Sequence, residues 1–417
     1  MTDLNDLPTT TKIYGMNLAN FFLAAVGDAN EPRTWSGIPY HIIRSAQRSS
    51  FQVEGLAFDL NEARSVPRRL VWAMSRLLAL RLPRGFQHSE HFLQAMWATI
   101  EEPVRGTAIV NCSQMYPSGL VDLGRHRLFF YLDQTLHQLY YYYRHADRVA
   151  ADIRRRSIAE ERRQYELSTA VIMQSQWAAN DVTQRYRICP SKVHVVLPGA
   201  NLDSDAVRVW ERNQSFRIPA DHLSRPFVLG FVGKEWARKG LDRLIKAVWI
   251  LHSQHKNVQL RVIGCEKKRL PRELQDCPAV TWLGFVDKQK DPLRFIELMG
   301  EFDLGCLLSD REAGGISLLE FARLGIPTLA PQTGGAPELT TLGATTLISP
   351  EARPEQIAER ILALMEQTGL IEAQRQAAWR HREYADWTRA INELAHLIDN
   401  SRCAPLAEQP APSVVLC

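Results

Sequence analysis

The chain has 417 residues, of which 45% are hydrophobic and 23% charged, and its formal net charge is +4. This composition is that of an ordinary globular protein long enough for two domains of about 200 residues each, and its mild positive charge gives no support for nucleic-acid binding. Because no apolar run approaches the roughly 18 to 20 residues that span a bilayer and the acidic start lacks the basic region of a signal peptide, we expect a cytoplasmic protein.

Strand-like and helix-like segments alternate in the first half of the chain. A helix is expected to begin near Ser36. Such alternation predicts an α/β domain built on a parallel, doubly wound sheet. Strands are predicted at residues 52–59, 107–112, 128–132, 170–174 and 193–197.

The segment Arg64–Arg84 carries six arginines among large apolar residues. It resembles a basic amphipathic helix that could lie on an anionic membrane. An interior helix with a cationic outer edge is the alternative interpretation, and the sequence leaves both open. Membrane contact would place the protein at the inner membrane face and would suit a substrate that is linked to a lipid.

The second half repeats the alternation with short connections, which predicts a second doubly wound domain. We place the first domain at residues 1–200 and the second at 201–385, with the boundary in the proline-containing stretch 198–226. Two such domains facing each other would form a cleft. A final helix is expected at 386–400, and 401–417 is expected to be a mobile tail. Strands are predicted at 227–233, 258–264, 280–286, 304–309, 327–330 and 345–349, and helices at 241–254, 292–299 and 357–367.

Two loops in this half carry the residues of a predicted anion site. Lys234, Arg238 and Lys239 follow the first strand, where they could neutralise a diphosphate. Taken alone, these cations favour a solvated charged loop, and their place beside Glu312 in the predicted cleft favours a binding role. The absence of a G-x-x-x-x-G-K-[ST] motif excludes a P-loop.

The second loop is Ser309–Glu320, which follows an apolar run, contains two adjacent glycines and opens a helix. Ser317 is the expected N-cap, and the free amides of the first turn would attract a phosphate. Glu312, directly after the strand, is interpreted as a site residue. Glu320 has two open interpretations, a ligand-binding carboxylate or a capping-box partner of Ser317. Paired carboxylates beside a phosphate cradle suit a nucleotide-sugar donor.

We predict no metal site and no cofactor. The seven cysteines form no C-x-x-C pair. The Asp203-Ser-Asp205 sequence lies in the proposed linker without the flanking strand of a metal-binding D-x-D, so it is interpreted as a solvated turn.

Three segments together resemble the donor-binding domain of retaining GT-B glycosyltransferases of the glycogen-synthase-like family 4. They are Gly233–Gly240, the Glu312-x7-Glu320 pair and Gly325–Glu338. The first domain resembles the family more weakly, and the helix at Trp387 looks like the one that crosses back onto it. The resemblance implies a GT-B fold with two Rossmann-like domains and a nucleoside-diphosphate sugar as donor.

The resemblance also implies residue roles. Lys234 and Lys239 would grip the diphosphate, Glu312 would hold hydroxyls of the donor sugar, and Glu320 would bind the ribose. Gly37 would let the first domain close over the diphosphate. The remaining implied contacts are the backbone amides of Ile316, Ser317 and Leu318 for phosphate, and Phe285 and Val286 for the base.

Three positions depart from the family pattern. Lys234 stands where an arginine is more frequent, and Gly314 replaces the usual aromatic residue. Asp133 stands where many relatives have a histidine. It is the candidate for positioning the hydroxyl acceptor or handling its proton, or else a cap for a helix at 134–142. The function implied is sugar transfer to a hydroxyl with retained anomeric configuration. The alternatives are a nucleotide-sugar epimerase and a non-catalytic scaffold.

Overall fold

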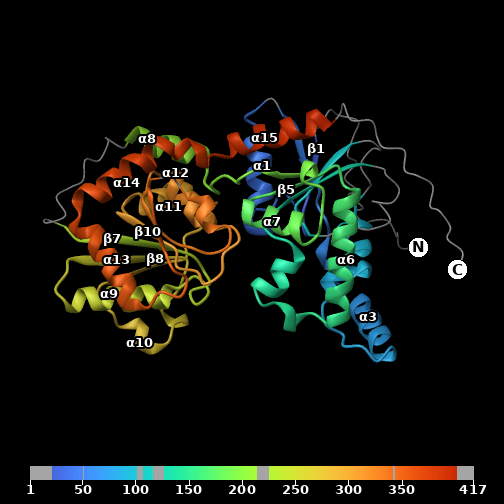
Figure 1. The fold of residues 1–417 in the computed structure, drawn as a ribbon, viewed down its shortest axis with the longest axis horizontal. Coiled ribbons are helices and arrows are strands. Elements are labelled where there is room, and N and C mark those ends of the chain that lie inside the picture. Colours follow the sequence, from blue (N-terminus) through green and yellow to red (C-terminus); the bar gives the residue numbers. More distant parts are fainter. Residues whose placement is uncertain are drawn as a thin grey trace, which may run out of the picture.

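Two parallel sheets of six strands each, covered by helices, form two α/β domains in the computed structural model (Figure 1). The structure describes residues 21–49, 51–100, 107–114, 116, 126–213, 225–340 and 343–401. The prediction of two doubly wound parallel-sheet domains is therefore confirmed. The tail expected at 401–417 lies outside the described residues, except for Ser401.

The first sheet has the strand order β2-β1-β3-β4-β5-β6, with every pair parallel. Its first strand was not predicted from the sequence, although its four residues are all buried. The strands are β1 (Phe21–Ala24), β2 (Val53–Gly55), β3 (Ala108–Asn111), β4 (Arg127–Leu132), β5 (Ala170–Met173) and β6 (Val193–Val195).

The second sheet has the order β12-β11-β10-β7-β8-β9. Because β7 lies between β8 and β10, the chain progresses in opposite directions from that point, and open α/β sheets bind ligands at such a switch point. The six predicted strands are all present, with ends shifted by a few residues. They are β7 (Phe227–Val232), β8 (Val258–Ile263), β9 (Val280–Gly284), β10 (Leu304–Cys306), β11 (Thr328–Pro331) and β12 (Thr345–Ile348).

Helices cover both faces of each sheet (Figure 1). In the first domain they are α1 (Ile38–Ala46), α2 (Leu60–Ala63), α3 (Val66–Leu78), α4 (Glu90–Trp97), a π-helical turn (Gln138–Tyr142), α6 (Ala151–Leu167) and α7 (Gln176–Gln184). In the remainder they are α8 (Ser204–Asn213), α9 (Leu241–Ser253), α10 (Arg272–Gln275), α11 (Pro292–Gly300), α12 (Ile316–Arg323), α13 (Pro354–Glu366), α14 (Thr368–His381) and α15 (Trp387–Asn400). Among the described helices, none is both long and apolar enough to cross a bilayer.

The last helix, α15, returns from the second domain and packs on the first (Figure 1). Trp387, Ile391 and Leu394 are buried in one apolar cluster with residues of α1 and of strands β1, β3, β4 and β5. Burying several large side chains in this way stabilises the crossing by several kcal/mol at about 25 cal/mol per Å² of apolar surface. The two domains are therefore joined both by the chain after β6 and by this helix.

Helix α3 presents its apolar side to the outside, so the expectation of an interior helix with a cationic outer edge is wrong. Trp72 and Arg76 are its buried residues. Arg76 forms a bidentate ion pair with Asp152 of α6, with Nη2 2.8 Å from Oδ1. Side chains that are more than half exposed are Val66, Leu70, Val71, Met74, Leu77 and Leu78 in the helix, followed by Leu80 and Leu82.

Candidate functional site

The two loops predicted to bind an anion lie side by side, because they follow β7 and β10 at the switch point of the second sheet. The Leu308 amide donates to the Lys239 carbonyl at 3.2 Å. Gly240 has a positive φ of 70°, and a Cβ there would lie 2.2 Å from the Leu308 carbonyl oxygen. Glycine is thus required where the basic loop passes the strand end.

Glu312 is a nearly buried carboxylate, 5% exposed, held by two side chains. Ser309 Oγ donates to its Oε2 at 2.8 Å, and Arg238 Nη1 donates to the same oxygen at 3.2 Å. Arg238 also contacts Glu235, and its guanidinium lies 6.0 Å from the Tyr143 ring centre. Arg238, rather than the lysine pair, is therefore the cation paired with this carboxylate.

Lys234 and Lys239 both belong to the basic loop, but their side chains contact different residues. Lys234 Nζ lies 4.6 Å from the ring centre of the exposed Phe285, a cation–π contact. Lys239 is half-buried, and its side chain covers Gly233. Val286 packs against an apolar cluster of this domain. The loop borders a recess of about 490 Å³ to which Arg269, a cation that sequence reasoning missed, also contributes.

Helix α12 begins at Ile316 with Gly315 as its N-cap, so the expectation that Ser317 caps it is wrong. Backbone hydrogen bonds, rather than a capping side chain, hold this turn. The Ile316 amide donates to the Gly314 carbonyl and the Leu318 amide donates to the Gly315 carbonyl, both at 2.8 Å. Two of the three amides expected to hold phosphate are thus engaged within the turn. Ser317 Oγ is buried and has no hydrogen-bond partner among the described residues.

Glu320 pairs with a lysine from the neighbouring loop. Lys288 Nζ lies 2.5 Å from Glu320 Oε1, whose side chain is nearly buried. Since Gly315 is the N-cap, the capping-box interpretation of Glu320 is wrong. Lys288 was not identified from the sequence, because a lysine in a charged loop after a strand carries no local signal.

Gly37 lies at the start of α1 in the left-handed region, with φ of 86°. Trp35 and Ser36 before it also have positive φ, which is a strained backbone for non-glycine residues. Asn201 stabilises the turn, since its Nδ2 donates to the Ser36 carbonyl at 2.8 Å while its Oδ1 accepts from Trp387 Nε1 at 3.0 Å. The turn is thereby tied to both interdomain connections.

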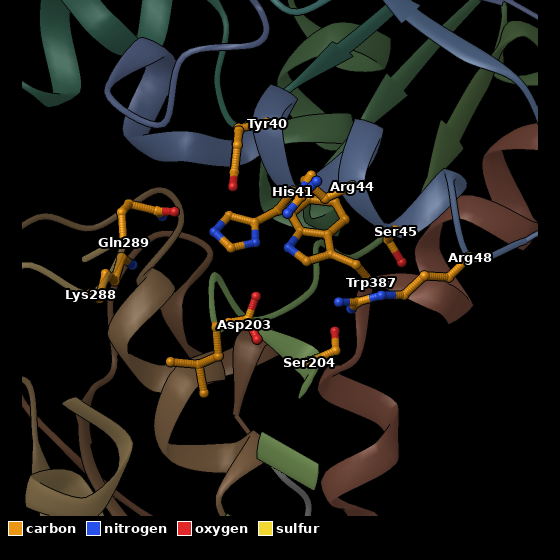
Figure 2. Close-up of a pocket in the computed structure, with 11 residues that line it drawn as sticks. Tyr40, His41, Arg44, Ser45, Arg48, Asp203, Ser204, Lys288, Gln289 and Trp387 are labelled. Atoms are coloured by element: carbon orange, nitrogen blue, oxygen red, sulfur yellow. The ribbon is translucent and has the colours of Figure 1, made fainter. Parts of the chain in front are cut away.

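A small recess lies beside this turn, where α1 meets the chain after β6, the loop of Lys288 and the start of α15 (Figure 2). Its volume of about 20 Å³ is enough for about one water molecule. Burial and the neighbouring charges of Lys288, Arg44 and Arg48 lower the pKa of His41 to about 3. His41 is therefore a neutral imidazole here.

Asp203 and Asp205, also near this recess, have structural partners. Asp203 Oδ1 accepts the amides of Asp205 and Ala206 at the start of α8, and Asp205 pairs with Arg48 and Arg208. The expected solvated turn is instead a helix cap. Across the described residues, no group of three or more possible ligands is placed to hold a metal ion.

Asp133 lies at the end of β4 and faces the loop of Glu312. A Cβ added at Gly314 would lie 3.7 Å from Asp133 Cβ and 3.7 Å from Gln174 Oε1. The pKa of Asp133 is raised to about 7, mainly by burial and further by the charge of Glu312. The following helical turn is capped by Thr135, whose Oγ1 accepts from the Gln138 amide at 3.1 Å. The structure thus brings Asp133 to Glu312 and gives the capping role to Thr135.

Tyr142 of the π-helical turn and Tyr143, which directly follows it, both bond to the loop of Glu312. Tyr142 OH accepts from the Glu312 amide at 3.1 Å, and Tyr143 OH accepts from the Ala313 amide at 2.6 Å. Nearby, Glu338 accepts from the amides of Gln176 and Trp177 at the start of α7. These contacts join the first domain to the loops of the second on the side where Asp133 lies. None of these contacts was identified from the sequence, because the partners are distant in the sequence.

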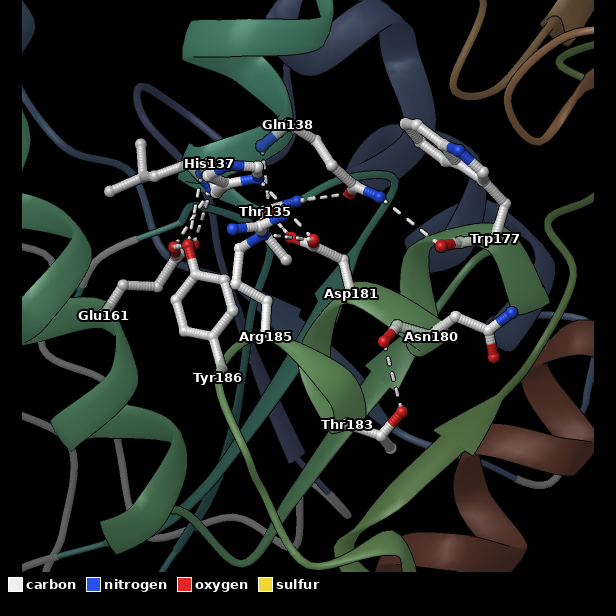
Figure 3. A network of polar contacts seen from close by, with 11 residues as sticks. Thr135, His137, Gln138, Glu161, Trp177, Asn180, Asp181, Thr183, Arg185 and Tyr186 are labelled. Carbon is white, nitrogen blue, oxygen red and sulfur yellow. Dashed lines mark hydrogen bonds and ion pairs between the residues drawn. The ribbon is translucent and has the colours of Figure 1, made fainter.

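A buried polar network positions the π-helical turn (Figure 3). Glu161 is fully buried and accepts from the Leu136 amide at 3.0 Å, from Tyr165 OH at 2.8 Å and from Tyr186 OH. Thr135 Oγ1 donates to Asp181 Oδ2 at 2.6 Å. Burial raises the pKa of Glu161 to about 8, although its hydrogen bonds act in the opposite direction.

Comparisons with known proteins agree with this architecture. Residues 214–382 match the sequence model of the family described as Glycosyl transferases group 1. A D-inositol 3-phosphate glycosyltransferase of Jonesia denitrificans is 26% identical over 266 residues, which are 61% of this chain and 62% of that protein. The corresponding protein of Corynebacterium jeikeium is 25% identical over 55% of this chain and 57% of its own. The chain thus spans less than two thirds of the relatives it matches.

Solved structures share the fold over a larger part of the chain. HepE from Anabaena, in complex with UDP and glucose, is 17% identical, with a TM-score of 0.56 over 91% of this chain and 99% of that one. WaaG, a glycosyltransferase involved in lipopolysaccharide biosynthesis, is 16% identical, with a TM-score of 0.52 over 91% and 98%. The two paired sheets and their crossing helix therefore define a GT-B fold. Within that class, residues 214–382 of the second domain are similar to the group 1 glycosyltransferases.

Proposed function

We propose that the protein transfers a sugar from a nucleoside diphosphate to a hydroxyl acceptor with retention of anomeric configuration. The observation that carries the proposal is the pairing of Glu312 with Arg238 and Ser309 at the switch point, between the basic loop and the start of α12. A carboxylate there can accept hydrogen bonds from sugar hydroxyls while the neighbouring cations hold the diphosphate. HepE, which shares the fold, binds UDP and UDP-glucose.

The roles follow from where the charges lie. Lys234 and Lys239 bind the diphosphate and stabilise it as it leaves, with Ser317 Oγ as a further donor at the positive end of α12. Glu320 binds the ribose, with Lys288 fixing its carboxylate, and Phe285 and Val286 contact the base. Ile316 and Leu318 contribute amides that are shared with the turn, and Gly37 allows the first domain to approach the diphosphate.

Retention is proposed from the resemblance to retaining enzymes. Because Glu312 is engaged by a guanidinium, it is a poor nucleophile, which favours a single displacement on one face over a covalent glycosyl-enzyme intermediate. In the proposed step the bond between the anomeric carbon and the phosphate oxygen breaks, and the acceptor oxygen bonds to the same face of that carbon. The leaving phosphate oxygen takes the acceptor proton, and Asp133 positions the acceptor. No metal ion is needed, since the cations of the basic loop supply the charge. Complete loss of transfer with a chelator, restored by manganese, would contradict that part.

The test is a transfer assay with a panel of nucleotide sugars and hydroxyl acceptors. Glu312→Gln keeps the size of the side chain but removes its charge, and we expect a loss of turnover of about a hundredfold or more. Anomeric analysis of the product by NMR reads the stereochemistry. Interconversion of the donor sugar without transfer would favour an epimerase, and no donor binding at all would favour a scaffold. Nothing in the described site favours either of them.

We further propose that α3 places the protein on an anionic membrane at the cytoplasmic face. Its outward side chains are large and apolar, which is uncommon for a side exposed to water. Charge complementarity argues for lipid, because the segment carries five arginines besides the buried Arg76. The adjacent groove of about 690 Å³ between α3 and α6 is also lined by Arg81, Arg156 and Arg163, together with Glu90 and Glu160. A lipid-linked hydroxyl is the acceptor class that such docking suits.

A further inference from the structure

Two polar side chains at the edge of the first sheet are buried without partners. Gln174 directly follows β5 and is 1% exposed, and neither its Nε2 nor its Oε1 has a hydrogen-bond partner among the described residues. Asp133 follows the adjacent strand β4, and its Oδ1 is also buried and unpartnered there. Because Leu132 pairs with Met173 in the ladder, Asp133 and Gln174 are the next residues in register.

Gly314 of the opposite domain faces both of them. A Cβ at this position would lie 3.7 Å from Asp133 Cβ, 3.7 Å from Gln174 Oε1 and 3.9 Å from Leu339 Cδ1, which are ordinary contact distances. The φ of Gly314 is not among the positive values of the chain. Neither the backbone nor the packing therefore requires glycine here, and the missing side chain leaves the space of about one small group.

A hydroxyl matches that space and those atoms. Each buried polar atom left without a partner costs about 1–3 kcal/mol, so a group that satisfies several of them at once gains affinity. Gln174 offers one donor and one acceptor, and Asp133 Oδ1 offers an acceptor. A hydroxyl can accept from Gln174 Nε2 and donate its one proton to Asp133 Oδ1, whereas an apolar group would leave all three atoms unpaired.

We propose that Gly314, Gln174 and Asp133 Oδ1 form a subsite that binds one hydroxyl of the transferred sugar and so selects the donor, in addition to the acceptor-positioning role proposed for Asp133. This rests on the proposed function, because the loop of Gly314 is the one that carries Glu312. The basic loop and the start of α12 bind the diphosphate elsewhere in the site. The subsite should therefore affect the sugar-dependent part of donor affinity and leave the affinity for the nucleoside diphosphate unchanged.

The first experiment compares binding of UDP alone with binding of UDP-glucose, UDP-galactose and UDP-N-acetylglucosamine by calorimetry on the full chain. Two variants alter the subsite, one in each domain. Gln174→Leu removes the amide, and Gly314→Ala fills the vacant position with a methyl group. Each is expected to reduce the gain in affinity of the best UDP-sugar over UDP by about tenfold or more, with UDP binding unchanged.

The matched control is Gln374→Leu. Gln374 is a buried glutamine on α14 with one unpartnered amide oxygen, so this variant makes the same change on a helix that carries none of the site residues named above. It is expected to bind every ligand as the wild type does. If Gln174→Leu weakens UDP and UDP-sugars equally, Gln174 has only a structural role and the subsite is wrong.

A second experiment uses monodeoxy analogues of the best UDP-sugar. Removing the hydroxyl that the subsite binds should weaken binding to the wild type but not to Gln174→Leu. Removing any other hydroxyl should change binding to both proteins by the same factor. Equal losses in both proteins for every analogue would overturn the subsite while leaving the proposed function intact. Failure of the wild type to bind UDP or any UDP-sugar would instead remove the proposed function, and the subsite with it.

Discussion

Arg238 Nη1 lies 3.2 Å from Glu312 Oε2, and this ion pair joins the loop after β7 to the loop after β10. Arg238→Ala would leave the buried carboxylate with Ser309 as its remaining side-chain donor. We expect kcat/KM for transfer to fall by about tenfold to a hundredfold, because a charge-assisted hydrogen bond contributes about 1.5–3 kcal/mol. Steady-state kinetics measures this. Arg294→Ala, at an exposed arginine of α11, is the control, and an equal loss in both variants would contradict a specific role.

Lys288→Met should destabilise the protein and weaken nucleotide binding together. The nearly buried Glu320 would lose its cation, which we expect to lower the free energy of unfolding by about 1–3 kcal/mol. Thermal denaturation with and without UDP reads both effects. The double variant Lys288→Met with Glu320→Gln should recover the stability but not the ribose contact. A stable Lys288→Met protein that binds UDP normally would show that the pair is dispensable.

Transfer should become faster as the pH rises through about 7, the value to which burial and the charge of Glu312 raise the Asp133 pKa. Only the ionised carboxylate can accept hydrogen bonds at both oxygens, so the active form predominates above that pH. Glu312, Tyr143 and Cys112 are the titratable groups coupled to it. A pH profile of kcat/KM measures this rise, and the rise should be absent in Asp133→Asn. If kcat/KM still rises through about pH 7 in this variant, the titrating group is not Asp133.

Glu161 should make the protein less stable as the pH rises. Its folded-state pKa of about 8 lies above its ordinary value of 4.5, so the folded protein binds more protons than the unfolded chain between these values. The free energy of unfolding therefore decreases from about pH 4.5 to pH 8. Glu161→Gln keeps an acceptor for the Leu136 amide and should show a smaller decrease. Urea denaturation at several pH values compares the two, and identical slopes would contradict the prediction.

The outward side of α3 should bind anionic vesicles. Liposome flotation with phosphatidylglycerol-containing vesicles should recover the wild type but not the double variant Leu77→Ser with Leu78→Ser, because both side chains are exposed and insert into the interface. Leu370→Ser, at an exposed leucine of α14, is the control. Binding should weaken with salt as the arginine contribution is screened. Loss of a wild-type dimer in the double variant, without vesicle binding, would assign this side to a second copy.

Much of the fold was predictable, because the signals that define its strands and helices lie close together in the sequence. Strands such as β7 and β10 are short apolar runs ended by glycine or polar residues, and helices such as α9 and α11 follow with regular spacing. These signals lie within a few residues of each other. Strand β1 was missed, and α3 could not be oriented, because amphipathic spacing defines two sides of a helix without saying which one the protein covers.

The sequence by itself determined two doubly wound domains, the basic loop and the loop with two glutamates, since each depends on residue types at fixed short spacings. Only the tertiary structure decided which groups meet. It paired Glu312 with Arg238, 74 residues away, and Glu320 with Lys288. It also placed Asp133 and Gln174 of one sheet opposite Gly314 of the other domain. Such contacts arise where strands distant in the sequence end at one edge, and the packing of two domains, rather than local spacing, sets them.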